Sequence, residues 1–289
     1  MANENKLFRA NSFKVVGTLA SADVKTGVAK NGGYVSVDAI VTSEFDGRMH
    51  EYQVGFFANE TTKEGAHSKL YDTYVGLKDL VNHKVEINGD IRENRYWSTN
   101  LGQLISTQLL SGRWVKSVPV TTADEGTYEL GGFFGRISEK RNKADEVYRY
   151  DVVIGQSNFN GDNMSVYTVH IDPTDREILA GVEGYSIGDT VKLKGTLAFT
   201  VETKTEVDPN SGFGQPMMRT FTNKQRNFYI TSGSNPIEGD NAYDTVTIST
   251  LKAAYEKRDL ELMSAAKTTT VTTPVVNEAP VTRRQTSLL

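Results

Sequence analysis

Two arginines stand beside two aromatic residues in a polar stretch of this chain. Arg92 and Arg95 precede Tyr96 and Trp97, and their other neighbours carry carboxylate, amide or hydroxyl groups. Guanidinium groups bind phosphates, and an exposed aromatic ring offers a face on which a nucleobase stacks, at about 1–3 kcal/mol per base. The stretch therefore predicts an exposed loop that contacts single-stranded nucleic acid.

Further candidates for the same chemistry follow along the chain. Arg113, Trp114 and Lys116 lie on a predicted strand, where alternation places Arg113 on one face and Trp114 with Lys116 on the other. Trp114 has two interpretations, a core tryptophan or a stacking surface, and the core role is the more common one. The second half of the chain adds Lys140, Arg141, Lys143, Arg149, Lys192, Lys194, Phe213, Arg219, Phe221, Lys224 and Arg226.

The sequence contains few of the residues and motifs that enzymes use for catalysis. Cysteine is absent, which excludes disulfides, thiolate metal sites and cysteine nucleophiles, and only four histidines are present. Loops of the Walker type, dinucleotide-binding glycine motifs and zinc-protease motifs do not occur. His170 with Asp172 and Asp175 resembles a metal cluster, but carboxylates at the start of a helix more often cap it, with Asp172 or Thr174 in that role. We expect no catalysis, no cofactor and no metal.

Composition limits the class of protein and its partners. The 289 residues, 38% hydrophobic and 24% charged, suffice for about two domains with cores of their own. The net charge of −4 is spread evenly, so a nucleic acid would have to be held by local patches of cations. Because no apolar run reaches the roughly 20 residues of a membrane span and the N-terminus is polar, the sequence predicts a cytoplasmic protein without a membrane partner.

The elements that must position these residues are mostly strands. Apolar and polar residues alternate between glycine, asparagine and aspartate punctuation, Asp46-Gly47 marks a hairpin, and Leu70, Tyr74, Leu77 and Leu80 recur at helical spacing. The first half therefore reads as three strands, a helix and two strands, over residues 13–19, 33–41, 50–57, 68–80, 84–91 and 103–118.

The same order returns in the second half, which indicates an internal repeat. Its helix is expected over 173–180 and its fifth strand over 220–231, after a glycine-rich hairpin at 208–215. The matching segments are 13–19 with 131–137, 34–41 with 148–154, 52–56 with 167–171 and 82–91 with 188–197.

This order, with Gly-Asp-Thr-Val-Lys-Leu-Lys-Gly-Thr-Leu opening the fourth strand at 188–197, resembles the OB-fold. The tandem copies, over 12–118 and 127–232, resemble a phage or bacterial single-stranded-DNA-binding protein. The resemblance implies that oligonucleotides bind on the face of strands 2 and 3, between the loops joining strands 1–2 and 4–5. Each candidate cation taken singly also fits an ordinary surface charge, and their convergence in these loops favours binding. Bacterial single-strand binders end in an acidic stretch with a hydrophobic tip, whereas this chain ends in Leu288 and Leu289 without an acidic run.

The resulting fold class is mainly β, with two tandem five-stranded OB-fold barrels, a C-terminal helix and a disordered tail. Leu251, Tyr255 and Leu262 form one stripe of a helix over 249–266, which either packs on the second barrel, the simpler expectation, or binds a partner. The expected domains are a first OB-fold at 1–118, a linker at 119–126, a second OB-fold at 127–236, the helix region at 237–266 and the disordered tail at 267–289.

These expectations lead to one functional hypothesis and two alternatives. The hypothesis is a non-enzymatic protein that binds single-stranded DNA with little sequence specificity, in DNA replication, recombination or repair. The protein would act in a bacterium, or in the cytoplasm of the bacterial host if it is phage-encoded, and its C-terminal region would contact replication or recombination proteins. The alternatives are a structural or adaptor protein that binds other proteins, such as a virion component, and a protein that binds single-stranded RNA.

Overall fold

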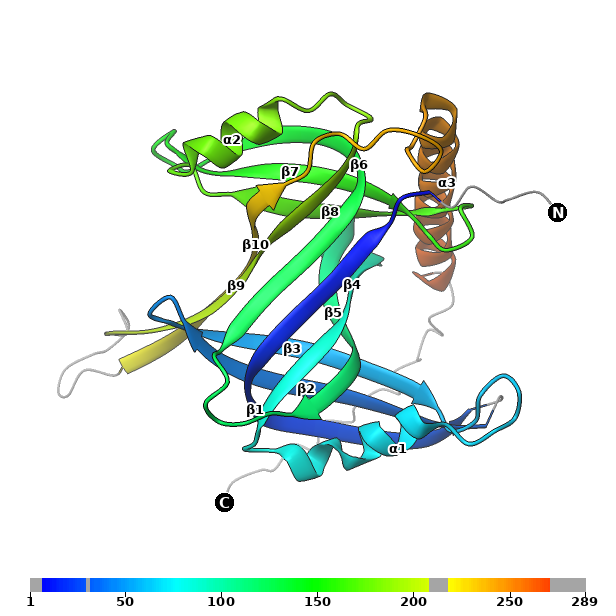
Figure 1. The fold of residues 1–289 in the computed structure, drawn as a ribbon, viewed down its shortest axis with the longest axis vertical. Coiled ribbons are helices and arrows are strands. Elements are labelled where there is room, and N and C mark those ends of the chain that lie inside the picture. Colours follow the sequence, from blue (N-terminus) through cyan, green and yellow to red (C-terminus); the bar gives the residue numbers. More distant parts are fainter. Residues whose placement is uncertain (1–6, 30–31, 208–217, 271–289) are drawn as a thin grey trace, which may run out of the picture.

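A computed structural model describes residues 7–29, 32–207 and 218–270 (Figure 1). In the first half the elements are β1 (Ala10–Ala29), β2 (Gly32–Phe45), β3 (Arg48–Asn59), α1 (Lys69–Val75) with the 3-10 turn Gly76–Leu80, β4 (Lys84–Ser98) and β5 (Gln103–Ser117). In the second half they are β6 (Glu125–Arg141), β7 (Val147–Ser157), β8 (Met164–Ile171), α2 (Arg176–Glu183), β9 (Thr190–Val207), β10 (Met218–Gly233) and α3 (Thr245–Thr270). The prediction of a mainly β protein with a C-terminal helix is confirmed.

Each half closes a ring of five strands by the same set of pairings. In the first half β1 pairs with β2 and β4, β2 with β3, β4 with β5, and β3 pairs in parallel with β5. In the second half β6, β7, β8, β9 and β10 repeat these pairings in the same order. This is the strand order of the OB-fold.

The two barrels share one continuous sheet. The first part of β1 pairs antiparallel with β6, so that β5-β4-β1-β6-β9-β10 run side by side, here called the central sheet. Phe13 lies opposite Tyr128 at the centre of this pairing. Figure 1 shows the long strands crossing between the barrels, with α1 at one end of the molecule and α2 at the other.

Glycines on the fourth strands make room for these two aromatic rings. A Cβ atom on Gly89 would lie 2.7 Å from the Phe13 ring, and one on Gly195 would lie 2.5 Å from the Tyr128 ring. Tyr128 is therefore the residue equivalent to Phe13. The alignment of 13–19 with 131–137 proposed from the sequence is therefore wrong by three residues. It matched the glycines of the two segments and not the aromatic residues that face a glycine.

The fourth and fifth strands extend far beyond the barrels. Residues 92–100, predicted as a loop, are strand up to Ser98, and that prediction is wrong. Cross-strand pairs such as Trp97 with Leu104 continue to the turn. The extensions are here called the β4–β5 arm (residues 92–109) and the β9–β10 arm (198–207 and 218–227).

Helix α3 packs with one face against the second barrel and begins four residues earlier than predicted. Ile248, Leu251 and Tyr255 form a small core with Phe133 of β6 and Met164 of β8. Its last four residues belong to the stretch predicted as a disordered tail, and 271–289 lie outside the described residues.

Helix α2 spans Arg176–Glu183 and so begins three residues later than predicted. Helix α2 starts after Asp175, whose side chain makes no capping hydrogen bond, so neither Asp172 nor Thr174 caps it as expected. Within the described part of the chain, no helix combines the length and apolar character needed to cross a membrane. The domain boundaries given above remain a prediction.

Candidate nucleic-acid interface

A pair of aromatic rings, one half-buried and one exposed, lies on the outer face of β2 and β3 in the first barrel. Strand alternation buries Val35 and Phe56 in the core and turns Tyr34 and Phe57 outward. The two outward rings stack with centroids 5.9 Å apart and planes 24° apart, and Phe57 is 60% exposed. Neither ring is among the residues predicted from the sequence to bind, although the alternation of both strands places Tyr34 and Phe57 outward.

The β9–β10 arm of the second barrel brings cations to this same strand. Lys224 forms an ion pair with Glu51 of β3 at 2.6 Å, and Arg226 donates to the side-chain oxygen of Gln53 at 2.9 Å. Both cations were predicted from the sequence. The first-barrel face is therefore built from two strands of its own barrel and an arm of the other.

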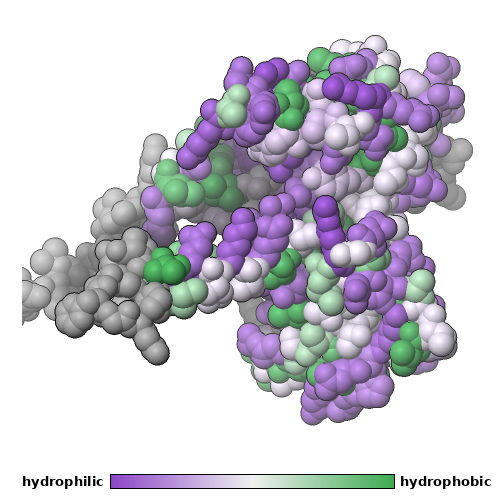
Figure 2. Space-filling model, turned by 90° about the vertical axis from the view of Figure 1, so that its left-hand side faces the viewer, coloured by the Kyte–Doolittle hydropathy of each residue, from purple (hydrophilic) through white to green (hydrophobic). Residues whose placement is uncertain are grey.

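The remaining predicted residues of this arm lie further out. Arg219 lies over the ring of Phe221 at 5.8 Å, and both side chains are exposed on β10. Phe213 lies outside the described residues. Viewed from the side of the arm, hydrophilic side chains predominate on the surface and hydrophobic ones are scattered (Figure 2).

The equivalent face of the second barrel is organised around a buried carboxylate. Asp151 on β7 accepts from Arg149 at 2.8 Å and from His170 at 3.1 Å, and Lys140 of β6 lies 3.6 Å away. Burial, and to a smaller extent the nearby Arg149, lowers the pKa of His170 to about 4, so this histidine is neutral at pH 7. Lys140 and Arg149, predicted from different segments, thus meet at one site.

The loop that follows β6 carries the other two predicted cations of this barrel. Arg141 is held by Glu139 at 2.5 Å and by the backbone oxygen of Asp145 at 2.9 Å. Lys143 is exposed and has no ion pair with another described residue. The loop places them at the edge of the second-barrel face.

The arginine and aromatic cluster at 92–97 is divided between two faces of the β4–β5 arm. Arg92 and Tyr96 point to one side and are exposed, whereas Arg95 and Trp97 point to the other and are half-buried. Arg95 donates two hydrogen bonds of 2.5 Å to Asp259 of α3. The two arginines therefore do not form the single loop surface that the sequence predicted.

Trp114 is 65% exposed, so its interpretation as a core residue is wrong. The cause is an irregularity where β4 pairs with β5, because Asn88 lies opposite Trp114 while Gly89 lies opposite Gly112. Arg113 occupies the extra position, and both Arg113 and Trp114 point outward. The simple alternation assumed from the sequence cannot anticipate such a bulge.

Cations on the outer face of the central sheet are paired with carboxylates. Arg113 binds Asp90, and the remaining pairs are Lys116 with Glu86 at 3.0 Å, Lys192 with Glu129 at 2.9 Å and Lys194 with Glu129 at 3.6 Å. Exposed ion pairs of this kind contribute about 0–1 kcal/mol each. A phosphate can therefore replace the carboxylate partner of such a cation at a small cost in free energy. Because each of these cations has a carboxylate partner, the net charge of this face is close to zero.

Among the described residues no group of three or more histidine, aspartate or glutamate side chains is placed to hold a metal ion. The Asp151 cluster has a single carboxylate surrounded by cations, which suits an anion and not a metal.

The fold is similar to that of the single-stranded DNA-binding protein from Thermus aquaticus. The wild-type structure has a TM-score of 0.50 at 12% identity, covering 80% of this chain and 95% of that chain. A deletion variant of the same protein has a TM-score of 0.50 at 13% identity, with 80% and 96% covered. At this identity the likeness concerns the fold alone.

No curated protein matches the sequence. The sequence does match the YorF family over residues 9–266. Because this match covers most of the chain, the protein belongs to the YorF family.

Proposed function

We propose that this protein binds single-stranded DNA with little sequence specificity and without catalysing a reaction. The observation that carries the proposal is the outward stack of Tyr34 and Phe57 on the β2–β3 face. Lys224 and Arg226 from the other barrel contact Glu51 and Gln53 further along the same face of β3. Aromatic faces accept any base, and cations follow the phosphates whatever the sequence. The likeness of the fold to a single-stranded DNA-binding protein supports the same conclusion.

The two halves serve in this proposal as tandem OB-fold modules. The second module presents Lys140 and Arg149 on the face equivalent to that of Tyr34 and Phe57. Joining two faces in one chain lengthens the contact with the strand and raises affinity through linkage. Because most cations exchange a carboxylate for a phosphate, binding is expected to weaken moderately with salt.

Such a protein serves DNA replication, recombination or repair in a bacterium or a phage, within the cytoplasm. The C-terminal region beyond the barrels is proposed to contact replication or recombination proteins.

The substitution Phe57→Ala tests the site. Losing one stacked base costs about 1–3 kcal/mol, so affinity for an oligo-dT strand should fall roughly tenfold. Phe57→Tyr keeps the ring and is the matched control, which should bind like the unchanged protein. Fluorescence anisotropy of a labelled strand measures both variants.

Equal affinity of Phe57→Ala and Phe57→Tyr would exclude the β2–β3 face as the site. Tighter binding of oligo-rU than of oligo-dT would assign the protein to RNA. A complete absence of binding to either strand would favour the adaptor hypothesis, in which the same aromatic faces contact proteins.

A further inference from the structure

We propose that the outer face of the central sheet carries a second track for single-stranded DNA, separate from the β2–β3 and β7–β8 faces. Its phosphate contacts are Arg9, Arg92 and Arg113, and its stacking surfaces are Trp114 and Phe159. The inference rests on the proposed function and extends it to a surface to which neither the fold likeness nor the family assigns a role.

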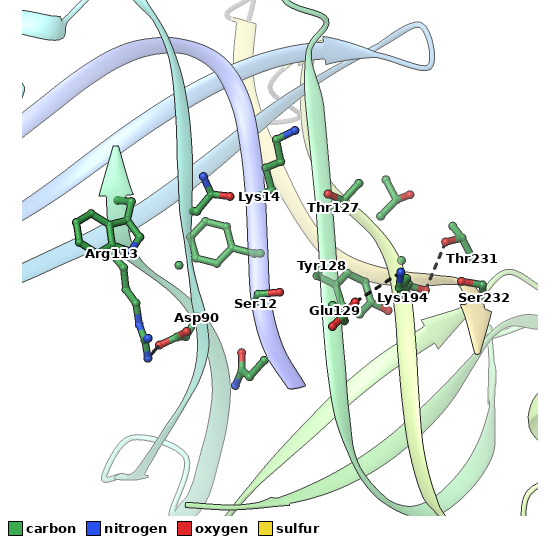
Figure 3. Close-up of a pocket in the computed structure, with 17 residues that line it drawn as sticks. Ser12, Lys14, Asp90, Arg113, Thr127, Tyr128, Glu129, Lys194, Thr231 and Ser232 are labelled. Carbon is green, nitrogen blue, oxygen red and sulfur yellow. Dashed lines mark hydrogen bonds and ion pairs between the residues drawn. The ribbon is translucent and has the colours of Figure 1, made fainter. Parts of the chain in front are cut away.

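The track is a groove made of two adjoining hollows. The first, of about 620 Å³, lies over β4, β1, β6 and β9, and Figure 3 shows Lys14 and Arg113 on one side of it and Lys194 on the other. The second, of about 440 Å³, lies at the N-terminal start of β1, around Arg9 and Asn11. Asn11, Asp90 and Arg113 line both hollows, so the two are continuous.

The second hollow has an excess of positive charge. Arg9, Arg92 and Arg113 line it together, against the single carboxylate of Asp90, which is bound to Arg113. Arg9 and Arg92 form no ion pair with another described residue, in contrast to Arg113, Lys116, Lys192 and Lys194 of the central sheet. Three converging guanidinium groups with one counter-charge fit a phosphodiester backbone.

Large exposed rings border the groove. Trp114 lines the first hollow and is 65% exposed, and Phe159, on the loop between β7 and β8, lines the second and is 80% exposed. Arg9 lies over the Phe159 ring at 5.9 Å. Bases of a strand that follows the arginines can therefore stack at both ends of the groove.

The equivalent place in the second barrel lacks these groups. The bulge that turns Arg113 and Trp114 outward has a counterpart in β10, where Ser232 lies opposite Lys194 and Ile230 lies opposite Gly195. The residues there are Thr231 and Ser232, so the bulge itself requires neither a cation nor an aromatic ring. Arg113 and Trp114 are thus not explained by barrel closure, which favours a binding role.

Tryptophan fluorescence gives a direct test, because the chain has only two tryptophans. In the full-length Trp97→Phe variant, Trp114 is the sole emitter. We expect oligo-dT to quench this emission to saturation, and added salt to reverse the quenching. The unchanged protein and Trp114→Phe, which leaves only Trp97, should show that most of the quenching belongs to Trp114.

Charge variants test the arginines in the same assay. Arg9→Ala with Arg92→Ala should weaken the binding seen at Trp114 about tenfold and reduce the slope of log affinity against log salt by about 1.4, at roughly 0.7 per phosphate contact. Lys78→Ala with Arg176→Ala removes two exposed cations from the helical segments at the barrel ends and is the matched control, which should retain the slope.

The outcomes separate this inference from the proposed function. Retarded mobility of the DNA without quenching of Trp114, or an unchanged salt slope in the double arginine variant, would overturn the second track and leave the β2–β3 face as the site. Absence of any mobility shift at low salt would overturn the proposed function and the track together.

Discussion

In each barrel a buried tyrosine hydroxyl donates a hydrogen bond to a backbone carbonyl of the other barrel. Only one of these two carbonyls has a second side-chain donor. Tyr52 of β3 donates to the Leu197 carbonyl at 2.7 Å, and Tyr167 of β8 donates to the Ile91 carbonyl at 3.1 Å. The Ile91 carbonyl also accepts from the side chain of Asn11 at 2.9 Å. Its equivalent, the Leu197 carbonyl, accepts from no other described side chain.

The reason lies in the residue equivalent to Asn11, which is Gly126. Glycine has no side chain to donate, and a Cβ atom on it would lie 2.1 Å from the Tyr52 hydroxyl. The tyrosine hydroxyl therefore occupies the space of the missing side chain. Burial raises the pKa of the Tyr52 phenol far above its usual value, with a smaller contribution from Asp124, so this group remains a donor at all ordinary pH values.

We therefore predict that Tyr52→Phe destabilises the protein more than Tyr167→Phe. Removing the Tyr52 hydroxyl leaves a buried carbonyl without its donor, at a cost of about 1–3 kcal/mol. Removing the Tyr167 hydroxyl leaves Asn11 as a donor to the Ile91 carbonyl, so the cost is that of one hydrogen bond, about 0.5–1.5 kcal/mol. Urea unfolding followed by circular dichroism measures both free energies.

In thermal unfolding, a loss of about 2 kcal/mol in Tyr52→Phe corresponds to a melting temperature lower by roughly 4–8 °C. Equal costs for the two variants, or a larger cost for Tyr167→Phe, would refute the assignment of Gly126 and Asn11 as the cause.

Three further predictions concern the helix, the buried histidine and a glycine. Asp259→Asn removes the charge that holds Arg95, so hydrogen exchange of the α3 amides should accelerate several-fold while exchange in the barrels stays unchanged. The pKa of His170 lies at about 4, below its unfolded value of 6.5, so the stability it contributes is complete above pH 6.5 and is lost as pH falls toward 4. At roughly 1.4 kcal/mol per pH unit this amounts to about 3 kcal/mol, and His170→Gln should flatten the fall in urea-unfolding free energy over that range. A Cβ atom on Gly89 would lie 2.0 Å from a backbone oxygen of β5, so Gly89→Ala should lower the melting temperature markedly, whereas Gly76→Ala, with open space around it, should leave it unchanged.

The sequence pattern predicts the barrels well because their strands have one buried and one exposed face. Alternation therefore marks β2 and β3 clearly, and the hairpin at Asp46-Gly47 forms as expected, with positive φ at both residues. In the arms neither face has a continuous core beneath it. Residues 92–98 consequently look like a loop in the sequence, although cross-strand pairing extends through them.

The candidate site is predicted only in part, because its residues are assembled by contacts between distant segments. Lys224 and Arg226 meet β3 only because an arm crosses from the other barrel. Arg95 is held by a helix residue 164 positions away, which no local pattern reveals. The sequence does not predict Arg9 as a site residue, because Arg9 contacts the ring of Phe159 only in the folded protein.

Equilibrium binding of the full-length protein to a labelled oligo-dT strand tests the central claim most directly. The account predicts saturable binding at low salt, weakened as salt rises and reduced about tenfold by Phe57→Ala. No change in anisotropy at low salt, up to the highest protein concentration that stays in solution, would contradict it.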